Sequence, residues 1–212
     1  MRLVLLSDTH TMHDQVVVPD GDVLIHAGDL TFTGRRDQWI AALAWFGNLP
    51  HPHKIYIAGN HDFGSEHFCR SVGNIDYLDN SGVSIDGHTF WGSPITPTFG
   101  RWAHMSDPEV IHEYWDKIPN DTEVLITHGP PYGILDESGL VDNPGHLGDE
   151  ALHDAVSERV QPAIHAFGHI HGGYGYKYPI RGAEDIPDIE FYNCSVVNEE
   201  YEVVNAPWVV DI

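Results

Sequence analysis

The sequence predicts an α/β fold in which buried strands and amphipathic helices follow one another along the chain. Short runs of apolar and β-branched residues recur, helical patterns lie between them, and polar residues gather where the runs end. The runs are continuous rather than alternating, which is typical of strands buried on both faces of a layered structure. With 212 residues, 42% of them apolar and 20% charged, the chain fits one globular domain, which we expect to span residues 1–212.

Seven segments are predicted to be strands. Five buried strands are expected at Leu3–Leu6, Val23–Ile25, Ile55–Ile57, Val124–Ile126 and Ala163–Phe167. The C-terminal segments FYNCSVV and PWVVDI predict two more. A hairpin is expected over Val83–Trp91, because Asp86-Gly87 is a typical two-residue turn between alternating residues.

Helices are predicted from apolar residues at helical spacing. The first apolar stripe consists of Trp39, Ile40, Leu43 and Phe46, and the second of Leu152, Val156 and Val160. The segment Ser106–Glu109 predicts another helix start, through a capping Ser106 or through Pro108 at the first helical position.

Polar residues follow the five buried strands at the point where each strand ends. In the order of the strands they are Asp8 and His10; Asp29; Asn60, His61 and Asp62; His128; and His169 and His171. In sheets of this kind the ligand crevice lies outside the carboxyl ends of the strands. We therefore expect the five strands to deliver these side chains to one rim.

The donor atoms at this rim are carboxylate and amide oxygens and imidazole nitrogens, without a thiolate. Such donors suit Mn²⁺, Fe²⁺ or Zn²⁺ better than a soft metal, and manganese is our first choice. There are too many candidate ligands for one ion, but they fit two divalent ions about 3.5–4 Å apart that share a carboxylate. Two such ions would lower the pKa of a bound water from about 15.7 toward about 7. They could also bind the phosphoryl oxygens of a phosphate ester.

The charge of the chain disfavours long nucleic acids as partners. Thirty-two acidic residues and ten basic residues give a net charge of −22. Duplex binding depends on Lys and Arg, which displace counterions from phosphates. The simplest interpretation of the excess of acidic residues is a strongly solvated surface.

The cysteines and the N-terminal segment favour a cytoplasmic protein. Cys69 and Cys194 lie far apart without a CxxC spacing, which suggests reduced, buried thiols. The segment MRLVLLSDTH has too few apolar residues for a signal peptide, and no later segment has the composition of a membrane span. We expect no membrane partner.

Five motifs, SDTH, AGD, GNHD, THG and GHIH, resemble in this order those of the calcineurin-like metallophosphoesterase superfamily. The resemblance implies two facing mixed β-sheets flanked by helices. It also implies a ligand set for each of two metal ions, with Asp29 bridging them. The first set would be Asp8, His10, Asp29 and His171, and the second Asp29, Asn60, His128 and His169.

The same resemblance suggests roles for His61 and Asp62. His61, beside the second metal ion, would stabilise the transition state and protonate the leaving oxygen, although it could instead be a further ligand. Asp62 would support His61 by hydrogen bonding.

The segments FGNLPHPHKIYIAGNHD, THGPPYGILD and FGHIHGGYG are similar to a narrower group, the small metallophosphoesterase-domain-containing phosphodiesterases. This similarity extends over nearly the whole chain and implies hydrolysis of cyclic nucleotides or similar small phosphodiesters. Some relatives lack the first histidine of the last motif, but His169 is present here. Both metal sites should therefore be complete.

Several other residues receive weaker interpretations. His26 lies inside the second strand and is read as a packed core histidine, whereas His13 is expected to lie behind the metal ligands or at the surface. The substrate could stack on an aromatic ring or meet Arg101, but no such residue is assigned a catalytic role. The aromatic candidates are Phe99, Trp102, Tyr132, Tyr174 and Tyr176.

Three alternative functions remain beside the phosphodiesterase. A phosphomonoesterase of the protein-phosphatase type would carry DRG after GD, where this chain has GDLTFTGRR with Arg35 and Arg36 expected at a helix start. A nuclease is disfavoured by the net negative charge, although a nuclease that acts on short oligonucleotides is not excluded. A non-enzymatic scaffold would be expected to lack some ligands, and this sequence has them all.

Overall fold

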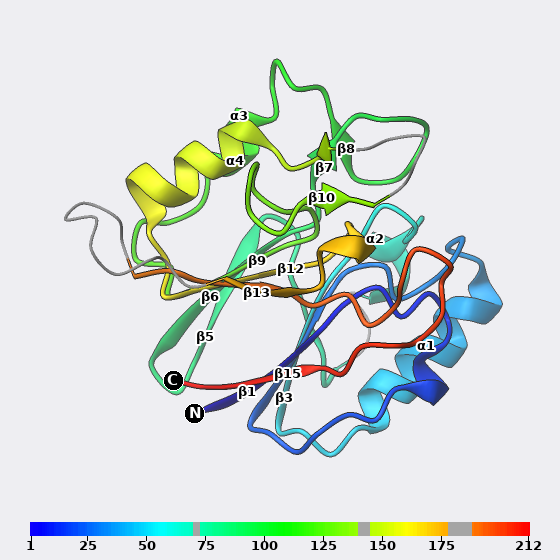
Figure 1. The fold of residues 1–212 in the computed structure, drawn as a ribbon. Helices are drawn as coiled ribbons and strands as arrows, with labels where there is room; N and C mark the ends of the chain where they lie inside the picture. Colours follow the sequence, from blue (N-terminus) through cyan, green and yellow to red (C-terminus); the bar gives the residue numbers. More distant parts are fainter. Residues whose placement is uncertain (70–72, 140–144, 178–187) are drawn as a thin grey trace.

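Two facing mixed sheets form the centre of the molecule (Figure 1). The computed structural model describes residues 1–69, 73–139, 145–177 and 188–212. The first sheet has the order β15-β1-β2-β3-β4, where β1 to β4 are parallel and β15 is antiparallel to β1. Its strands are β15 Trp208–Asp211, β1 Arg2–Leu6, β2 Val23–Ala27, β3 His53–Ile57 and β4 Asp76–Tyr77.

The second sheet has the order β13-β14-β12-β9-β6-β5. Its four inner strands are parallel, and its two edge strands, β13 and β5, are antiparallel to their neighbours. Its strands are β13 Gly175–Lys177, β14 Glu190–Asn193, β12 Ile164–Phe167, β9 Val124–Thr127, β6 His88–Ser93 and β5 Ser81–Ile85. Two short pairs lie outside the sheets: β7 Thr96–Pro97 with β8 Met105–Ser106, and β10 Glu137–Ser138 with β11 Gly145–His146.

The hydrophobic core lies in three layers. Between the sheets, side chains such as Leu5 and Ile25 of the first pack against Val124 and Ile126 of the second. The outer face of the first sheet packs on helix α1 (Arg36–Asn48), and that of the second on α3 (His112–Trp115) and α4 (Glu150–Asp154). This arrangement confirms the predicted fold class.

The remaining helical segments are short. Helix α2 spans Ser65–Phe68, α4 continues into a π-helical segment at Ala155–Val160, and 3-10 turns occupy His13–Gln15 and His171–Gly173. Among the residues that the structure describes, no helix has the length and apolar character that crossing a bilayer requires.

The predicted strands and the hairpin are confirmed, except that the strand expected at FYNCSVV ends at Asn193. The turn of the hairpin is Asp86-Gly87, with φ angles of 51° and 93°, as a two-residue turn between β5 and β6 requires. Helix α1 begins at Arg36 after Arg35, and the second predicted stripe is buried in α4 and its π-helical continuation.

Two details of the helix predictions are wrong. Ile40 is 59% exposed, because the buried face of α1 is formed by Trp39, Ala42 and Phe46, and Ile40 follows Trp39 by about 100° of rotation. Ser106 lies in β8, where it pairs with Pro97, so the chain is extended at the expected helix start. A turn on the Asp107 carbonyl follows, and the helix begins only at His112.

Candidate metal centre

The carboxyl ends of the parallel strands meet at one rim, and their polar residues have unusual backbone conformations there. Asp8, His10, Asp29 and His169 have φ angles of 57°, 42°, 56° and 68°, which place all four in the left-handed region. Such conformations are costly for residues other than glycine and gather at functional sites.

Glycines let these turns approach one another closely. A Cβ atom on Gly59 would overlap the Asp29 carboxylate, and one on Gly168 would overlap the Asp8 carboxylate. The glycines of the GNHD and GHIH motifs are therefore required by packing around the two aspartates.

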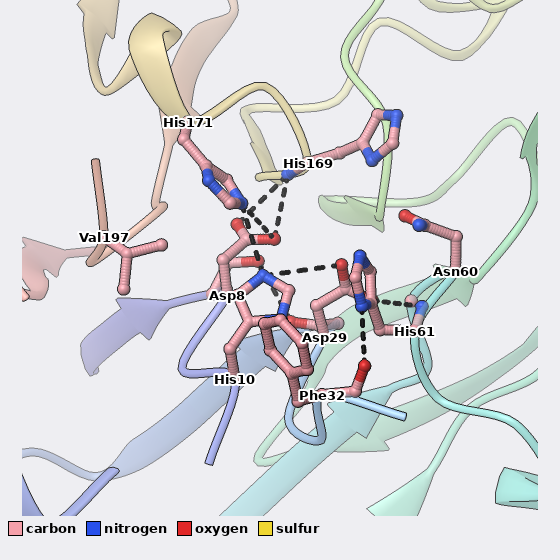
Figure 2. A network of polar contacts seen from close by, with 12 residues as sticks. Asp8, His10, Asp29, Phe32, Asn60, His61, His169, His171 and Val197 are labelled. Carbon is pink, nitrogen blue, oxygen red and sulfur yellow. Dashed lines mark hydrogen bonds and ion pairs between the residues drawn. The ribbon is translucent and has the colours of Figure 1, made fainter. Parts of the chain in front are cut away.

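The structure brings the predicted metal ligands together (Figure 2). Among the described residues, three groups of donor atoms lie within 4.8 Å of one another: Asp8, His10 and His171; His10, Asp29 and His61; and Asp29, His128 and His169. The first and third groups contain only residues of the two predicted sets, and the Oδ1 atom of Asn60, predicted for the second set, lies 2.9 Å from His128 Nε2. The Asp29 Oδ2 atom lies 3.7 Å from His10 Nε2 and 3.4 Å from His128 Nε2, between the two sets.

Backbone carbonyls orient three of the imidazole rings. The Nδ1 atoms of His61, His128 and His171 lie 2.8, 2.9 and 3.1 Å from the carbonyl oxygens of Phe32, Ala27 and Asn198. A carbonyl only accepts, so each Nδ1 carries the proton and donates it. The Nε2 atoms are left to face the rim, as in histidines that bind a metal.

The contact between His128 and Asn60 tests whether the site suits a cation. The Asn60 Oδ1 atom is a hydrogen-bond acceptor. When the His128 ring is neutral and its proton is on Nδ1, His128 Nε2 is also an acceptor. Two acceptors 2.9 Å apart need a proton or a cation between them. Burial lowers the pKa of His128, but Asp29 outweighs it and raises the pKa to about 9. The same two atoms would be ligands of one cation, so this donor set fits a divalent metal.

The two carboxylates are held in their charged form despite complete burial. Burial favours the neutral acid, but the hydrogen bond and charge of His171 outweigh it and keep the pKa of Asp8 below its usual range. His128 does the same for the pKa of Asp29. Burial lowers the pKa of His10 to about 4 and that of His169 to about 3, so these rings stay neutral, as ligands must be.

His61 lies beside the first set. One of its ring nitrogens lies within 4.8 Å of the donor atoms of His10 and Asp29, and the His10 and His61 ring centroids are 4.7 Å apart. The resemblance placed it beside the second metal ion, whereas among the described donor groups it falls with His10 and Asp29.

The prediction that Asp62 supports His61 by a hydrogen bond is wrong. Within the described part of the chain, the Asp62 carboxylate accepts from the backbone of Leu30, Thr31 and Gly59, from the Thr31 hydroxyl and from the Tyr56 hydroxyl. These groups converge on Asp62 from β3 and from the loops after β2 and β3, so its carboxylate joins the loop of Asp29 to the loop of Asn60. His61 is oriented by the Phe32 carbonyl instead.

Residues of a C-terminal hairpin, which sequence reasoning missed, also reach the site. Val197 pairs with Val203, and the turn between them brings Glu199 and Tyr201 to a cavity of about 340 Å³ at the metal centre. The Tyr201 ring lies edge-on to His10 and His171, at centroid distances of 4.9 and 5.3 Å. No local pattern in NEEYEV could have shown this, because the approach depends on tertiary contacts.

The other singled-out residues fall into two groups. Phe99 and Trp102 line the cavity, whereas Arg101 is exposed and belongs to no described part of the lining. Tyr174 stacks on Trp208, Tyr176 packs against Tyr192 with the rings tilted, and Tyr132 lies beside His146, which places these three rings in other packing contacts.

Two predicted non-ligand histidines are buried in packed positions. His26 is fully buried in the core, 3.1 Å from the Thr9 hydroxyl, as expected. His13 is also buried and packs against Trp45, so it does not lie at the surface, and it belongs to none of the described donor groups.

Comparison with known proteins identifies the chain's relatives. It is 36% identical over its whole length to human metallophosphoesterase domain-containing protein 1, of which it spans 71%. It is 40% identical over 82% of its length to a UPF0046 protein of Caenorhabditis elegans, of which it spans 65%. The chain thus spans about two thirds of the length of these relatives. A family model for the calcineurin-like phosphoesterases matches residues 1–173, which include all seven predicted ligands, and the chain belongs to that family.

Proposed function

We propose that the protein is a phosphodiesterase that uses two divalent metal ions to hydrolyse small phosphodiesters, cyclic nucleotides among them. The observation that carries the proposal is the adjoining groups of Asp and His donor atoms beside one cavity, which Asp29, His169 and His171 line. Asp8, His10, Asp29 and His171 would hold one ion, and Asp29, Asn60, His128 and His169 the other.

The donor set supports the proposed metals. Oxygen and imidazole donors without a thiolate favour Mn²⁺, Fe²⁺ or Zn²⁺, with manganese as our first choice. Bound at this site, the ions would supply Lewis-acid charge that lowers the pKa of a water and offsets the charge on the phosphoryl oxygens. The fully buried thiols of Cys69 and Cys194 agree with the reducing cytoplasm that we propose as the protein's location.

His61 is the proposed general acid. Its Nδ1–H donates to the Phe32 carbonyl, which fixes the ring, and the side chain lines the cavity. The charged imidazole can donate its Nε2 proton to the leaving oxygen as the P–O bond breaks. The ring then remains as the neutral Nδ1–H tautomer, which the Phe32 carbonyl already favours.

The cavity supports a small diester over the rival substrates. Among the described residues that line it there is neither a lysine nor an arginine, which a dianionic monoester would need as a clamp. A polymer would bring further phosphates to a surface with a net charge of −22. At physiological ionic strength the attraction of the metal ions is screened beyond about 8–10 Å.

A hydrolysis comparison tests the proposed function. The manganese-loaded protein would be given a cyclic nucleotide, a nucleoside monophosphate and a single-stranded oligonucleotide, at low and moderate salt. We expect the highest kcat/KM for the cyclic nucleotide at both salt concentrations. A preference for the oligonucleotide at both would make the protein a nuclease, and a preference for the monophosphate would make it a monoesterase.

A further inference from the structure

The turn of the C-terminal hairpin, residues 197–203, contacts a predicted metal ligand through its backbone. The Asn198 carbonyl oxygen accepts the Nδ1–H of His171 at 3.1 Å. This bond holds the ring with its Nε2 atom 3.7 Å from Asp8 Oδ1 and 3.3 Å from His10 Nε2. The position of the Asn198 carbonyl therefore sets the direction in which His171 offers its lone pair.

The side chain of Asn198 closes the turn that carries this carbonyl. Its Oδ1 atom accepts the backbone N–H groups of Glu200 and Glu202 at 3.1 and 2.8 Å. Its Nδ2 atom donates to the Glu202 carboxylate at 3.0 Å. Without this side chain the two N–H groups would have only water as a partner, and the turn that directs the carbonyl toward His171 would loosen.

The same turn places the ring of Tyr201 against the first ligand set. Tyr201 has a φ of 62°, a conformation that is costly for a bulky residue. Its own N–H and that of the next residue both bond to Asn198, so the turn maintains this conformation. The ring then lies edge-on to His10 and His171, at centroid distances of 4.9 and 5.3 Å. A strained backbone thus packs a ring against two imidazoles of one ligand set.

The base of the hairpin is anchored beside Asp8, a further ligand of the first set. The Val196 N–H donates to the carbonyl of Ser7, the residue that precedes Asp8. The Val196 carbonyl accepts the N–H groups of Val204 and Asn205, which joins the second arm of the hairpin to the first. The hairpin is therefore built on the end of β1, and its contacts converge on one set of ligands.

The second ligand set has other supports. Within the described part of the chain, no hydrogen bond or ring contact joins residues 197–203 to its Asn60, His128 or His169. In the view of Figure 2, Val197 and Asn60 lie on opposite sides of the two carboxylates. The hairpin also lies beyond residues 1–173, the part that the family model matches, so the five shared motifs do not specify it.

We propose that the hairpin of residues 197–203, through Asn198, positions the first ligand set and sets the affinity of one metal ion without changing that of the other. Asn198 is a positioning residue, because it acts through His171. The inference rests on the proposed two-metal function and adds that the two ions occupy separately supported sites.

Metal binding measures this role without any substrate. The full chain would be dialysed against graded concentrations of Mn²⁺, and the ions per chain would be counted by elemental analysis. Asn198→Ala should hold one ion as tightly as the wild type and need about tenfold more Mn²⁺ for the other, as when a group that orients a ligand is removed. Unchanged affinities for both ions, or an equal loss for both, would overturn the inference. A wild-type protein with fewer than two ions would overturn the two-metal function on which it rests.

Ligand variants identify the ion that responds. His171→Ala removes a ligand of the first set, and His169→Ala removes one of the second. Asn198→Ala added to His171→Ala should not weaken the remaining ion further, because the carbonyl then has no ring to orient. Added to His169→Ala, it should still weaken the remaining ion about tenfold. The reverse pattern would place the effect of the hairpin in the second set and overturn the inference.

A double variant separates the hydrogen bonds of Asn198 from a general effect of substitution. Combining Asn198→Asp with Glu202→Gln exchanges donor and acceptor in the side-chain bond, keeps an oxygen for both backbone N–H groups and preserves the net charge. This variant should bind both ions as tightly as the wild type. Glu200→Gln, at an exposed position of the same turn, should do so too. Binding by the double variant as weak as that of Asn198→Ala would overturn the role of these bonds.

Discussion

The Nε2 atoms of His10 and His171 lie 3.3 Å apart, although 161 positions separate the two residues in the chain. His171 donates its Nδ1–H to the Asn198 carbonyl, so its Nε2 presents a lone pair to His10 when the ring is neutral. Asp8 Oδ1 lies 3.7 Å from the same nitrogen. Two imidazoles and a carboxylate grouped in this way are a donor set that can hold one ion.

The first prediction concerns metal content. We expect elemental analysis of the protein after dialysis against manganese to give two ions per chain. The Asp29→Ala variant should retain fewer metal ions than the wild type. It should also hydrolyse a nitrophenyl diester more than about 10³-fold more slowly, since Lewis-acid stabilisation supplies several kcal/mol. Asp14→Ala, at an exposed position, is the control. Near-normal turnover of the metal-loaded Asp29→Ala protein would contradict the bridging role.

A second prediction separates His61 from the ligands. His61→Ala should keep nearly all of its metal and lose roughly 10²–10⁴ in turnover, the usual contribution of a positioned acid. The loss should be smaller for a nitrophenyl ester than for a cyclic nucleotide, because nitrophenolate leaves without protonation. An equal loss on both substrates would make His61 an electrostatic or positioning residue, and loss of metal would make it a ligand.

The third prediction assigns Asp62 a structural role. Its carboxylate accepts five hydrogen bonds, and an amide in its place would turn a donor toward some of those donors. Asp62→Asn should therefore lower the free energy of unfolding by about 3 kcal/mol or more, as loss of hydrogen bonds to a buried charge does. Urea unfolding would measure it, with the exposed Asp121→Asn as control. If Asp62→Asn were as stable as the wild type but inactive, Asp62 would have a direct catalytic role.

The site was predictable to the extent that it follows from strand geometry. Each predicted ligand follows a buried parallel strand within four residues, so a prediction of the strands alone places Asp8 and Asp29 at one edge of a sheet. The shared motifs then separate the ligands from the other histidines. The prediction that two sheets face each other rested on the family resemblance, because continuous apolar runs do not reveal which sheet a strand joins.

What the sequence could not predict depends on contacts between distant segments. Asp62 follows His61 directly, yet its carboxylate turns to Leu30 and Thr31, about 30 positions away. Tyr201 reaches the site only because the pairing of Val197 with Val203 closes the hairpin beneath it. Neither residue lies in a periodic pattern or a turn signal that would indicate its partners.

The last prediction uses His165, which is buried in the second sheet and is not one of the predicted ligands. Its Nε2 atom lies 2.8 Å from the Thr127 hydroxyl, which itself donates to the Gly129 carbonyl. The hydroxyl therefore accepts from His165, and the Nδ1 atom is left buried without a partner among the described residues. Burial lowers the pKa of His165 from 6.5 to about 3 in the folded protein.

Because this pKa is lower in the folded state, the unfolded chain binds one more proton at His165 between about pH 6.5 and pH 3. Stability is therefore lost as the pH falls through this window, by up to about 1.4 kcal/mol per pH unit for this group. His165→Phe removes the titration and packs between Phe167 and Phe191, so its urea unfolding at pH 7, 6 and 5 should show a shallower pH dependence than that of the wild type. His112→Phe, at an exposed position, should keep the wild-type dependence. The same slope for His165→Phe and wild type would show that His165 gains its proton as easily in the folded state, which its unpartnered, buried Nδ1 atom argues against.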